Sequence, residues 1–91
     1  MESRDIRILN KNNKYYPSVW DVEIMHSYPI NVNYIIHCFQ LKKEEFRSIL
    51  EQYNGIIQGF TMEFNSLNDI QYYIDEWLRP RIIMAILIDR T

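Results

Sequence analysis

The most restrictive feature of this chain is an uninterrupted apolar run at residues 82–88, IIMAILI, which lies between Arg81 and Asp89. As a helix, the run would be apolar on every side, and such a helix is stable only when other elements surround it. The abundance of isoleucine also fits a strand. Seven residues span about 10 Å as a helix, far less than the roughly 20 residues that cross a bilayer. We therefore expect that the run does not insert into a membrane and that other protein segments bury it.

The length of the chain limits the cover that it can supply by itself. Its 91 residues fit one domain, residues 1–91, and a domain of this size buries only roughly 60–65% of the surface that its unfolded chain exposes. Hydrophobic residues nevertheless make up 47% of the chain, which excludes a disordered protein. We therefore expect surplus apolar surface that contacts a protein partner or a second copy in a homo-oligomer.

Charge and composition disfavour several other classes of protein. The 10 Lys and Arg against 12 Asp and Glu give a net charge of −2, whereas nucleic-acid-binding modules usually carry a basic excess. The lone Cys38 excludes an internal disulfide, and the charged start MESRDIRILN lacks the apolar region of a signal peptide. We therefore expect a cytoplasmic protein that does not bind nucleic acid.

The N-terminal half predicts a β-hairpin. Residues 10–18, NKNNKYYPS, are typical of a surface loop. Residues 19–26, VWDVEIMH, alternate like a half-buried strand, and residues 34–41, YIIHCFQL, give a second strand after a turn at Pro29. If the hairpin closes near residues 30–31, its core face carries Trp20, Val22, Ile24, Ile36 and Cys38. Its outer face carries Asp21, Glu23, Met25, Ile35, His37, Phe39 and Leu41.

Residues 41–55 predict a helix. An apolar stripe with helical spacing runs through Phe46, Ile49, Leu50 and Tyr53. Asn54 and Gly55 supply a left-handed stop. Residues 56–64 then predict a strand with Phe60, Met62 and Phe64 on one face.

Ser66 opens a second predicted helix, because Ser66 and Asp69 form a variant of the capping box. Its buried stripe consists of Leu67, Ile70, Ile74, Trp77 and Leu78. Pro80 should kink the helix. Residues 82–88 are interpreted as its continuation, with a strand as the open alternative. The predicted fold class is α+β: a small antiparallel sheet of three to four strands with two helices packed on one face, the second kinked at Pro80.

No cluster of residues predicts chemistry. On a strand, His37 and Cys38 would point to opposite faces, so they would not converge on a metal ion or form a catalytic pair. Glu23 and His37 could meet across the hairpin, but such a pair is usually a simple ion pair. We therefore expect no enzyme activity, no cofactor and no metal.

The favoured hypothesis is a small protein-binding module that acts by occlusion or assembly, such as a regulator, an immunity protein or a phage-type inhibitor. Its Ile, Asn, Tyr and Lys content is similar to that of small proteins from AT-rich genomes and their phages. The predicted partner-binding residues are Ile35, His37, Phe39, Tyr72, Asp75, Glu76, Ile82 and Ile86. The alternative is single-stranded nucleic-acid binding through the aromatic residues Tyr15, Tyr16, Trp20, Tyr28 and Tyr34.

Overall fold

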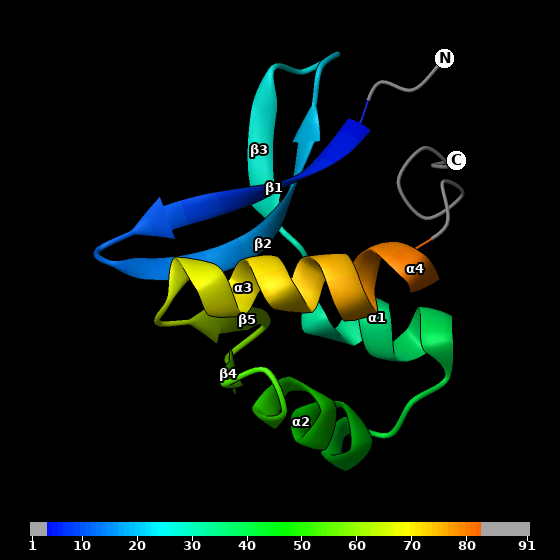
Figure 1. The fold of residues 1–91 in the computed structure, drawn as a ribbon. Coiled ribbons are helices and arrows are strands. Elements are labelled where there is room, and N and C mark those ends of the chain that lie inside the picture. Colours follow the sequence, from blue (N-terminus) through cyan, green and yellow to red (C-terminus); the bar gives the residue numbers. More distant parts are fainter. Residues whose placement is uncertain (1–3, 83–91) are drawn as a thin grey trace.

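The computed structural model describes residues 4–82 and shows an α+β fold with an antiparallel sheet (Figure 1). The strands are β1 (Arg4–Lys11), β2 (Lys14–Asp21), β3 (His26–Pro29), β4 (Gly55–Gln58) and β5 (Thr61–Phe64). The helices are α1 (Val32–Phe39), α2 (Lys43–Glu51) and α3 (Leu67–Tyr73), and α3 continues through the π-helical turn η1 (Ile74–Leu78) into α4 (Arg79–Arg81). The predicted α+β class with a small antiparallel sheet is confirmed. The predicted detail is not, because the described part of the chain has five strands in the sheet and not three to four, and α1 is an additional helix.

Strand β2 organises the sheet because it has partners on both edges. Strand β1 pairs with it along its whole length, from Arg4 opposite Asp21 to Lys11 opposite Lys14. The other edge is shared, since β3 pairs with residues 18–21 and β5 meets β2 at Tyr15. Strand β4 extends the sheet beyond β5.

Pro17 lies in the middle of β2, where a proline cannot donate a ladder hydrogen bond. In a strand, the N–H and C=O groups of one residue point to the same edge. The Pro17 carbonyl accepts a hydrogen bond of 3.0 Å from Ile30 N, on the β3 side. The N–H group that Pro17 lacks would therefore point to this same edge of β2, at the place where β3 and β5 separate. The hydrogen bonds between β1 and β2 are not interrupted.

Two predictions for the N-terminal half are wrong because the chain turns at other places. Residues 10–18 are mostly strand, not surface loop, and Asn12 and Asn13, with φ of 53° and 63°, form a two-residue turn between β1 and β2. Asparagine is favoured in such turns because both positions require positive φ. The predicted strand at 19–26 ends at Asp21, and residues 22–25 are a turn in which Val22 and Ile24 are exposed, not part of the core.

The predicted strand at 34–41 is also wrong, because most of it is helix α1. The Asn31 side chain accepts the Asn33 N–H at 2.8 Å and caps the first turn. Gln40, with φ of 54°, ends the helix. The predicted pairing of the two strands is therefore absent, and with it the two sheet faces assigned to them.

Helix α2 confirms the predicted helix at 41–55. Phe46 and Leu50 are buried, and Ile49 and Tyr53 pack against the core. Asn54 has φ of 62°, the left-handed conformation predicted for the stop.

The predicted cap of the second helix is confirmed, because Ser66 Oγ accepts the Asp69 N–H at 3.3 Å. Leu67 is half exposed and does not join the buried stripe, whereas Tyr73 is fully buried. The strand predicted at 56–64 is a hairpin instead. Gly59, with φ of 64°, occupies its turn beside the exposed Phe60.

The structure does not confirm a simple kink at Pro80. Instead, the π-helical turn η1 precedes the proline, and the Arg79 N–H bonds the Ile74 carbonyl five residues back. Ile82, with φ of −78° and ψ of 100°, ends the helix in an extended conformation. The rest of the apolar run, including Ile86, lies outside the described residues.

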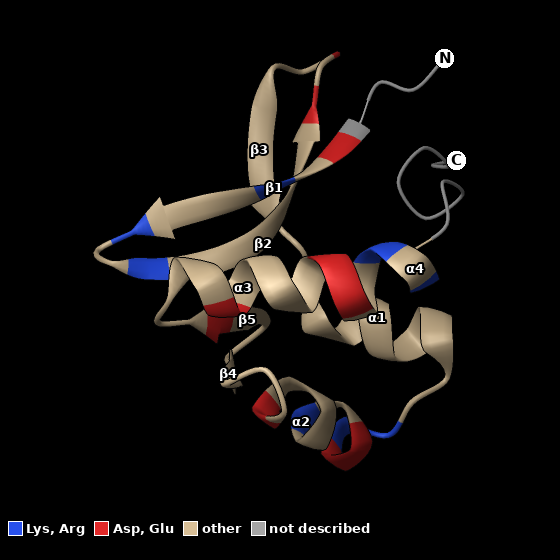
Figure 2. Cartoon of the chain, viewed as in Figure 1, with Lys and Arg blue, Asp and Glu red and all other residues tan. Residues whose placement is uncertain are grey.

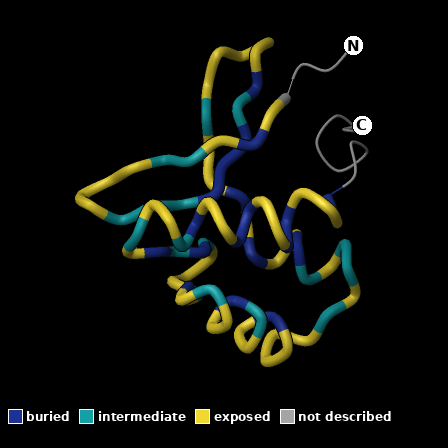
Figure 3. The backbone as a smooth tube through the Cα atoms, in the orientation of Figure 1, coloured by how far each residue is buried: buried dark blue, intermediate teal, exposed yellow. Residues whose placement is uncertain are grey.

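The core lies between the sheet and the helices, where the buried segments face one another (Figure 3), and Trp77 of η1 belongs to it. The Trp77 ring centre is 5.7 Å from those of Phe39 in α1, Phe46 in α2 and Tyr73 in α3. Ile6 and Val19 contribute the sheet side of the core. One aromatic residue therefore joins all three helices.

Gly55 is a close-packed position where a larger residue should destabilise the fold. A Cβ atom there would lie 2.4 Å from Cε2 of Phe64, whose ring is fully buried and packs 5.2 Å from that of Tyr73. We expect Gly55→Ala to lower the free energy of unfolding by about 1–3 kcal/mol, measured by urea denaturation.

The control for this prediction is Gly59→Ala. A Cβ atom at Gly59 meets no atom within 4 Å, so its expected cost is only the roughly 1 kcal/mol of a left-handed φ. Unchanged stability of Gly55→Ala would contradict the crowding that the structure indicates.

Candidate protein-binding surface

The turn between β2 and β3 presents three large apolar side chains to solvent. Val22, Ile24 and Met25 are 47%, 61% and 68% exposed, and we call these three residues the hairpin tip. The turn projects from the sheet at the end of the molecule away from α2, and its backbone is exposed (Figures 1 and 3). Apolar groups gathered on a projection are accessible to another protein.

Local interactions hold the turn in one shape. The Asp21 carboxylate accepts the Glu23 N–H at 3.0 Å, and Asp21 is itself buried. In the antiparallel pairing of β2 with β3, Asp21 lies opposite His26 at the base of the turn. Met25 has φ of 53°, and a left-handed conformation costs a residue other than glycine about 1–2 kcal/mol. The exposed Met25 side chain gains little packing in return.

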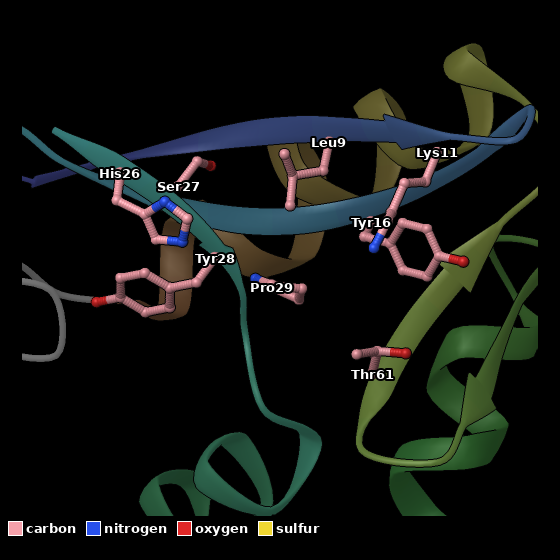
Figure 4. A pocket seen from close by; sticks show the side chains of 8 residues that line it. All are labelled: Leu9, Lys11, Tyr16, His26, Ser27, Tyr28, Pro29 and Thr61. Atoms are coloured by element: carbon pink, nitrogen blue, oxygen red, sulfur yellow. The ribbon is translucent and has the colours of Figure 1, made fainter.

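A groove of about 560 Å³ lies beside the tip, where β3 and β5 part along β2 (Figure 4). It is lined by Leu9, Lys11, Tyr16, His26, Ser27, Tyr28, Pro29 and Thr61. Figure 4 places His26 and Tyr28 at one end and Tyr16 and Lys11 at the other. His26, which lines one end of the groove, directly follows Met25 of the hairpin tip in the chain.

The Tyr16 end of the groove is polar. The Tyr16 hydroxyl donates to Glu63 Oε1 at 3.1 Å. Partial burial, together with the hydrogen bond and charge of Glu63, raises the pKa of Tyr16, so the hydroxyl stays neutral. Lys14 Nζ lies 3.9 Å from Glu63 Oε2 and donates to Asn65 Oδ1 at 2.6 Å. Contacts within the chain therefore balance the Glu63 charge.

The aromatic residues of the nucleic-acid hypothesis do not share one surface. Tyr15 packs against the core, whereas Tyr16 and Trp20 alternate with it and lie on the opposite sheet face. Tyr34 belongs to α1. The Arg7 guanidinium lies 4.7 Å from the centre of the Trp20 ring. Acidic residues occur near the β2–β3 turn and along α3, and basic residues at the β1–β2 turn (Figure 2).

The structure separates the predicted partner-binding residues. Ile35 and Ile82 are 0% and 5% exposed, so the chain itself encloses them and they are not surface side chains. Phe39 is half-buried against Trp77. The exposed members of the set lie on two helical segments: His37 on α1, and Tyr72, Asp75 and Glu76 on α3 and η1. Ile86 lies outside the described residues.

The outer face of α3 and η1 is engaged in contacts within the helix. The hydrogen bond and charge of Glu76 raise the pKa of Tyr72. Asp75 Oδ1 accepts from Gln71 Nε2 at 3.2 Å and lies 3.8 Å from Arg79 Nε. Such i, i+4 contacts are typical of a solvated helix surface.

The structure also places His37 and Cys38 differently from the prediction. They are neighbours on helix α1, not on a strand, and Glu23 belongs to the β2–β3 turn, so no cross-strand Glu23–His37 pair exists. Within residues 4–82, no three His, Cys, Asp or Glu side chains are grouped so that they could hold a metal ion. No helix in this part of the chain is long and apolar enough to cross a membrane.

Sequence reasoning missed the hairpin tip because Trp20, Val22 and Ile24 alternate like a half-buried strand. One signal of the turn was present, since aspartate at position 21 readily accepts the backbone N–H two residues later. Comparisons with known proteins add no relative: the chain matches no family model, no curated protein and no solved structure.

Proposed function

We propose that this chain is a protein-binding module that inserts its hairpin tip into an apolar pocket of a partner protein. The observation that carries the proposal is the exposure of Val22, Ile24 and Met25 on a turn held by Asp21. Gathered apolar side chains mark interaction sites. A turn that is already ordered also loses less conformational entropy on binding.

The charges beside the tip define the partner further. Glu23 is exposed within the turn, and its neighbours Val22 and Ile24 are apolar. The complementary site is therefore an apolar pocket with a basic or hydrogen-bond-donating group at its rim. By filling such a pocket, the module would act by occlusion, as a regulator or a phage-type inhibitor does, or by assembly.

Substitution at the tip tests the proposal. Wild-type chain, Ile24→Ser and the control Leu67→Ser are compared as baits in extracts of the producing cells, and retained proteins are quantified by mass spectrometry. Leu67 is a suitable control because it is 52% exposed on α3, away from the tip. We expect one protein to be retained by wild type and Leu67→Ser and lost with Ile24→Ser.

The purified partner then gives the decisive measurement. In calorimetric titrations, Ile24→Ser should weaken binding about tenfold or more, as expected for a central apolar contact. Equal binding by Ile24→Ser, or an equal loss with Leu67→Ser, would overturn the assignment of the tip as the contact surface.

Met25→Asn should change stability and binding in opposite directions. Asparagine tolerates the left-handed conformation better than methionine, so we expect the free energy of unfolding to rise by about 0.5–1 kcal/mol. Binding to the partner should weaken, because the exposed thioether chain is lost. Urea denaturation measures the first effect and titration the second. A loss of stability would instead show that Met25 serves the fold.

Single-stranded nucleic-acid binding is a second candidate, which one observation favours. Tyr16 and Trp20 share a sheet face with Arg7 and Lys11, and aromatic rings among cations can stack with bases. The hypothesis predicts that a labelled oligothymidine binds at low salt, dissociates steeply as salt rises, and binds Trp20→Ala more weakly. Absence of binding at low salt would eliminate it.

A further inference from the structure

Strand β1 is the longest edge strand in the described sheet. Its eight residues pair with β2 in continuous register, and no other described strand pairs with it. Neither a bulge nor a proline interrupts it, whereas β3 and β4 have four residues each. A long regular edge offers unpaired N–H and C=O groups to another strand.

The hydrogen-bond phase identifies the backbone groups that face outward. Pro17 points its carbonyl toward β3, so its partner Ile8 does not exchange hydrogen bonds with β2. Successive residues of a strand point their backbone groups to opposite edges. Ile6, Ile8 and Asn10 therefore point their N–H and C=O groups to the free edge. Arg7 and Leu9 point theirs to β2.

The alternation of outward-facing and inward-facing residues restricts how a second copy can pair antiparallel with β1. Outward-facing residues must oppose outward-facing residues, so the twofold axis must pass through a residue and not between two. An axis at Arg7 places Arg7 against itself, and an axis at Leu9 places Arg7 against Lys11 of the second copy. An axis at Ile6 shortens the overlap to residues 4–8 of the described strand.

An axis at Ile8 has none of these disadvantages. It pairs residues 5–11 of each copy, and it places Asp5 opposite Lys11 of the second copy twice, once on each side of the axis. Both side chains are exposed and lie on the same sheet face. Figure 2 shows an acidic segment near the start of β1 and a basic segment at its end, which an antiparallel copy would bring together.

We propose that two copies of this chain associate through their β1 edges, antiparallel, with Ile8 opposite Ile8 and Asp5 opposite Lys11. The two sheets then form one continuous sheet. The interface uses no residue of the hairpin tip, so it stands or falls independently of the proposed function.

Charge swaps test both the partner and the register. Sedimentation equilibrium of the full chain at low ionic strength compares wild type with Asp5→Lys, Lys11→Asp and the double variant. Each single change creates two like-charge pairs, so the dissociation constant of the dimer should rise about tenfold or more. The double variant restores both opposite-charge pairs and should associate as tightly as wild type within about threefold.

The control Lys43→Asp reverses one exposed charge on α2, away from β1, and should leave the association unchanged. Among the described contacts within one chain, the swaps remove the exposed Asp5–Arg7 ion pair of 3.8 Å, which has little effect on folding. Circular dichroism checks that each variant is folded.

Hydrogen exchange gives a readout that needs no variant. The amides of Ile6, Ile8 and Asn10 should gain protection as the protein concentration rises, and those of Arg7 and Leu9 should not change. A wild-type monomer at every concentration, single swaps that associate normally, or a double variant that stays monomeric would each overturn the proposal.

Discussion

Trp77→Ala should lower the free energy of unfolding by about 3–5 kcal/mol, the range expected for truncation of a large buried aromatic side chain. Trp77 is 6% exposed, and its ring packs against Phe39, Phe46 and Tyr73 from three different helices. The Arg81 guanidinium lies 4.7 Å from the centre of the same ring. Removal of the ring would leave a cavity at the junction of α1, α2 and α3, which urea denaturation would report.

The other tryptophan provides a matched control. Trp20 is half-buried on the open sheet face, where it contacts Arg7 and not the core cluster. We expect Trp20→Ala to cost about 1 kcal/mol, because less apolar surface returns to water. Similar losses for the two variants would mean that Trp77 does not organise the core as the structure indicates. Trp77→Phe, which keeps a ring, should recover part of the lost stability.

The two helices whose signals are local were predictable from sequence. The cap at Ser66 involves residues three apart, and the stripe of α2 lies within two turns. Such features fix a helix independently of the partner against which it packs. The extent of η1 was not predictable, because a π-helical turn has no comparable local signature.

Helix α1 shows why the strand prediction failed. Ile and Tyr favour strands, so the composition of residues 34–41 predicts a strand. The helical signal was nevertheless present, since Val32, Ile35, Ile36 and Phe39 follow the i, i+3, i+4, i+7 pattern. Asn31, directly before that stripe, is a favoured cap residue and does cap α1.

The candidate surface was not predictable for a different physical reason. Whether Val22 and Ile24 are buried depends on where the chain reverses, and strand pairing is a long-range property that periodicity does not encode. Residues chosen for apolar character, such as Ile35 and Ile82, are the ones that a core also selects. Tyr72, Asp75 and Glu76 are exposed on α3 and η1, because they lie between the positions of the buried stripe, and that spacing is local.

Alkaline pH should destabilise the chain through Tyr73. Burial, with a smaller contribution from Tyr53, raises the pKa of Tyr73 far above its ordinary value of 10.0. Below that pH, both the native and the unfolded states keep the proton. Above it, the unfolded state releases a proton that the native state retains, so the free energy of unfolding falls as pH rises. The expected slope is about 1.4 kcal/mol per pH unit, or roughly 2.7 kcal/mol over two units.

Tyr73→Phe isolates this contribution. The Tyr73 hydroxyl donates to Met62 Sδ at 3.3 Å, and a thioether is a weak acceptor, so at neutral pH the substitution should change stability by less than about 1 kcal/mol. In urea titrations at rising pH, Tyr73→Phe should become progressively more stable than wild type. Tyr28→Phe, which removes a hydroxyl from an exposed ring on β3, should follow wild type. Parallel pH profiles for wild type and Tyr73→Phe would contradict the buried neutral tyrosine, and with it the packing of α3 against β5.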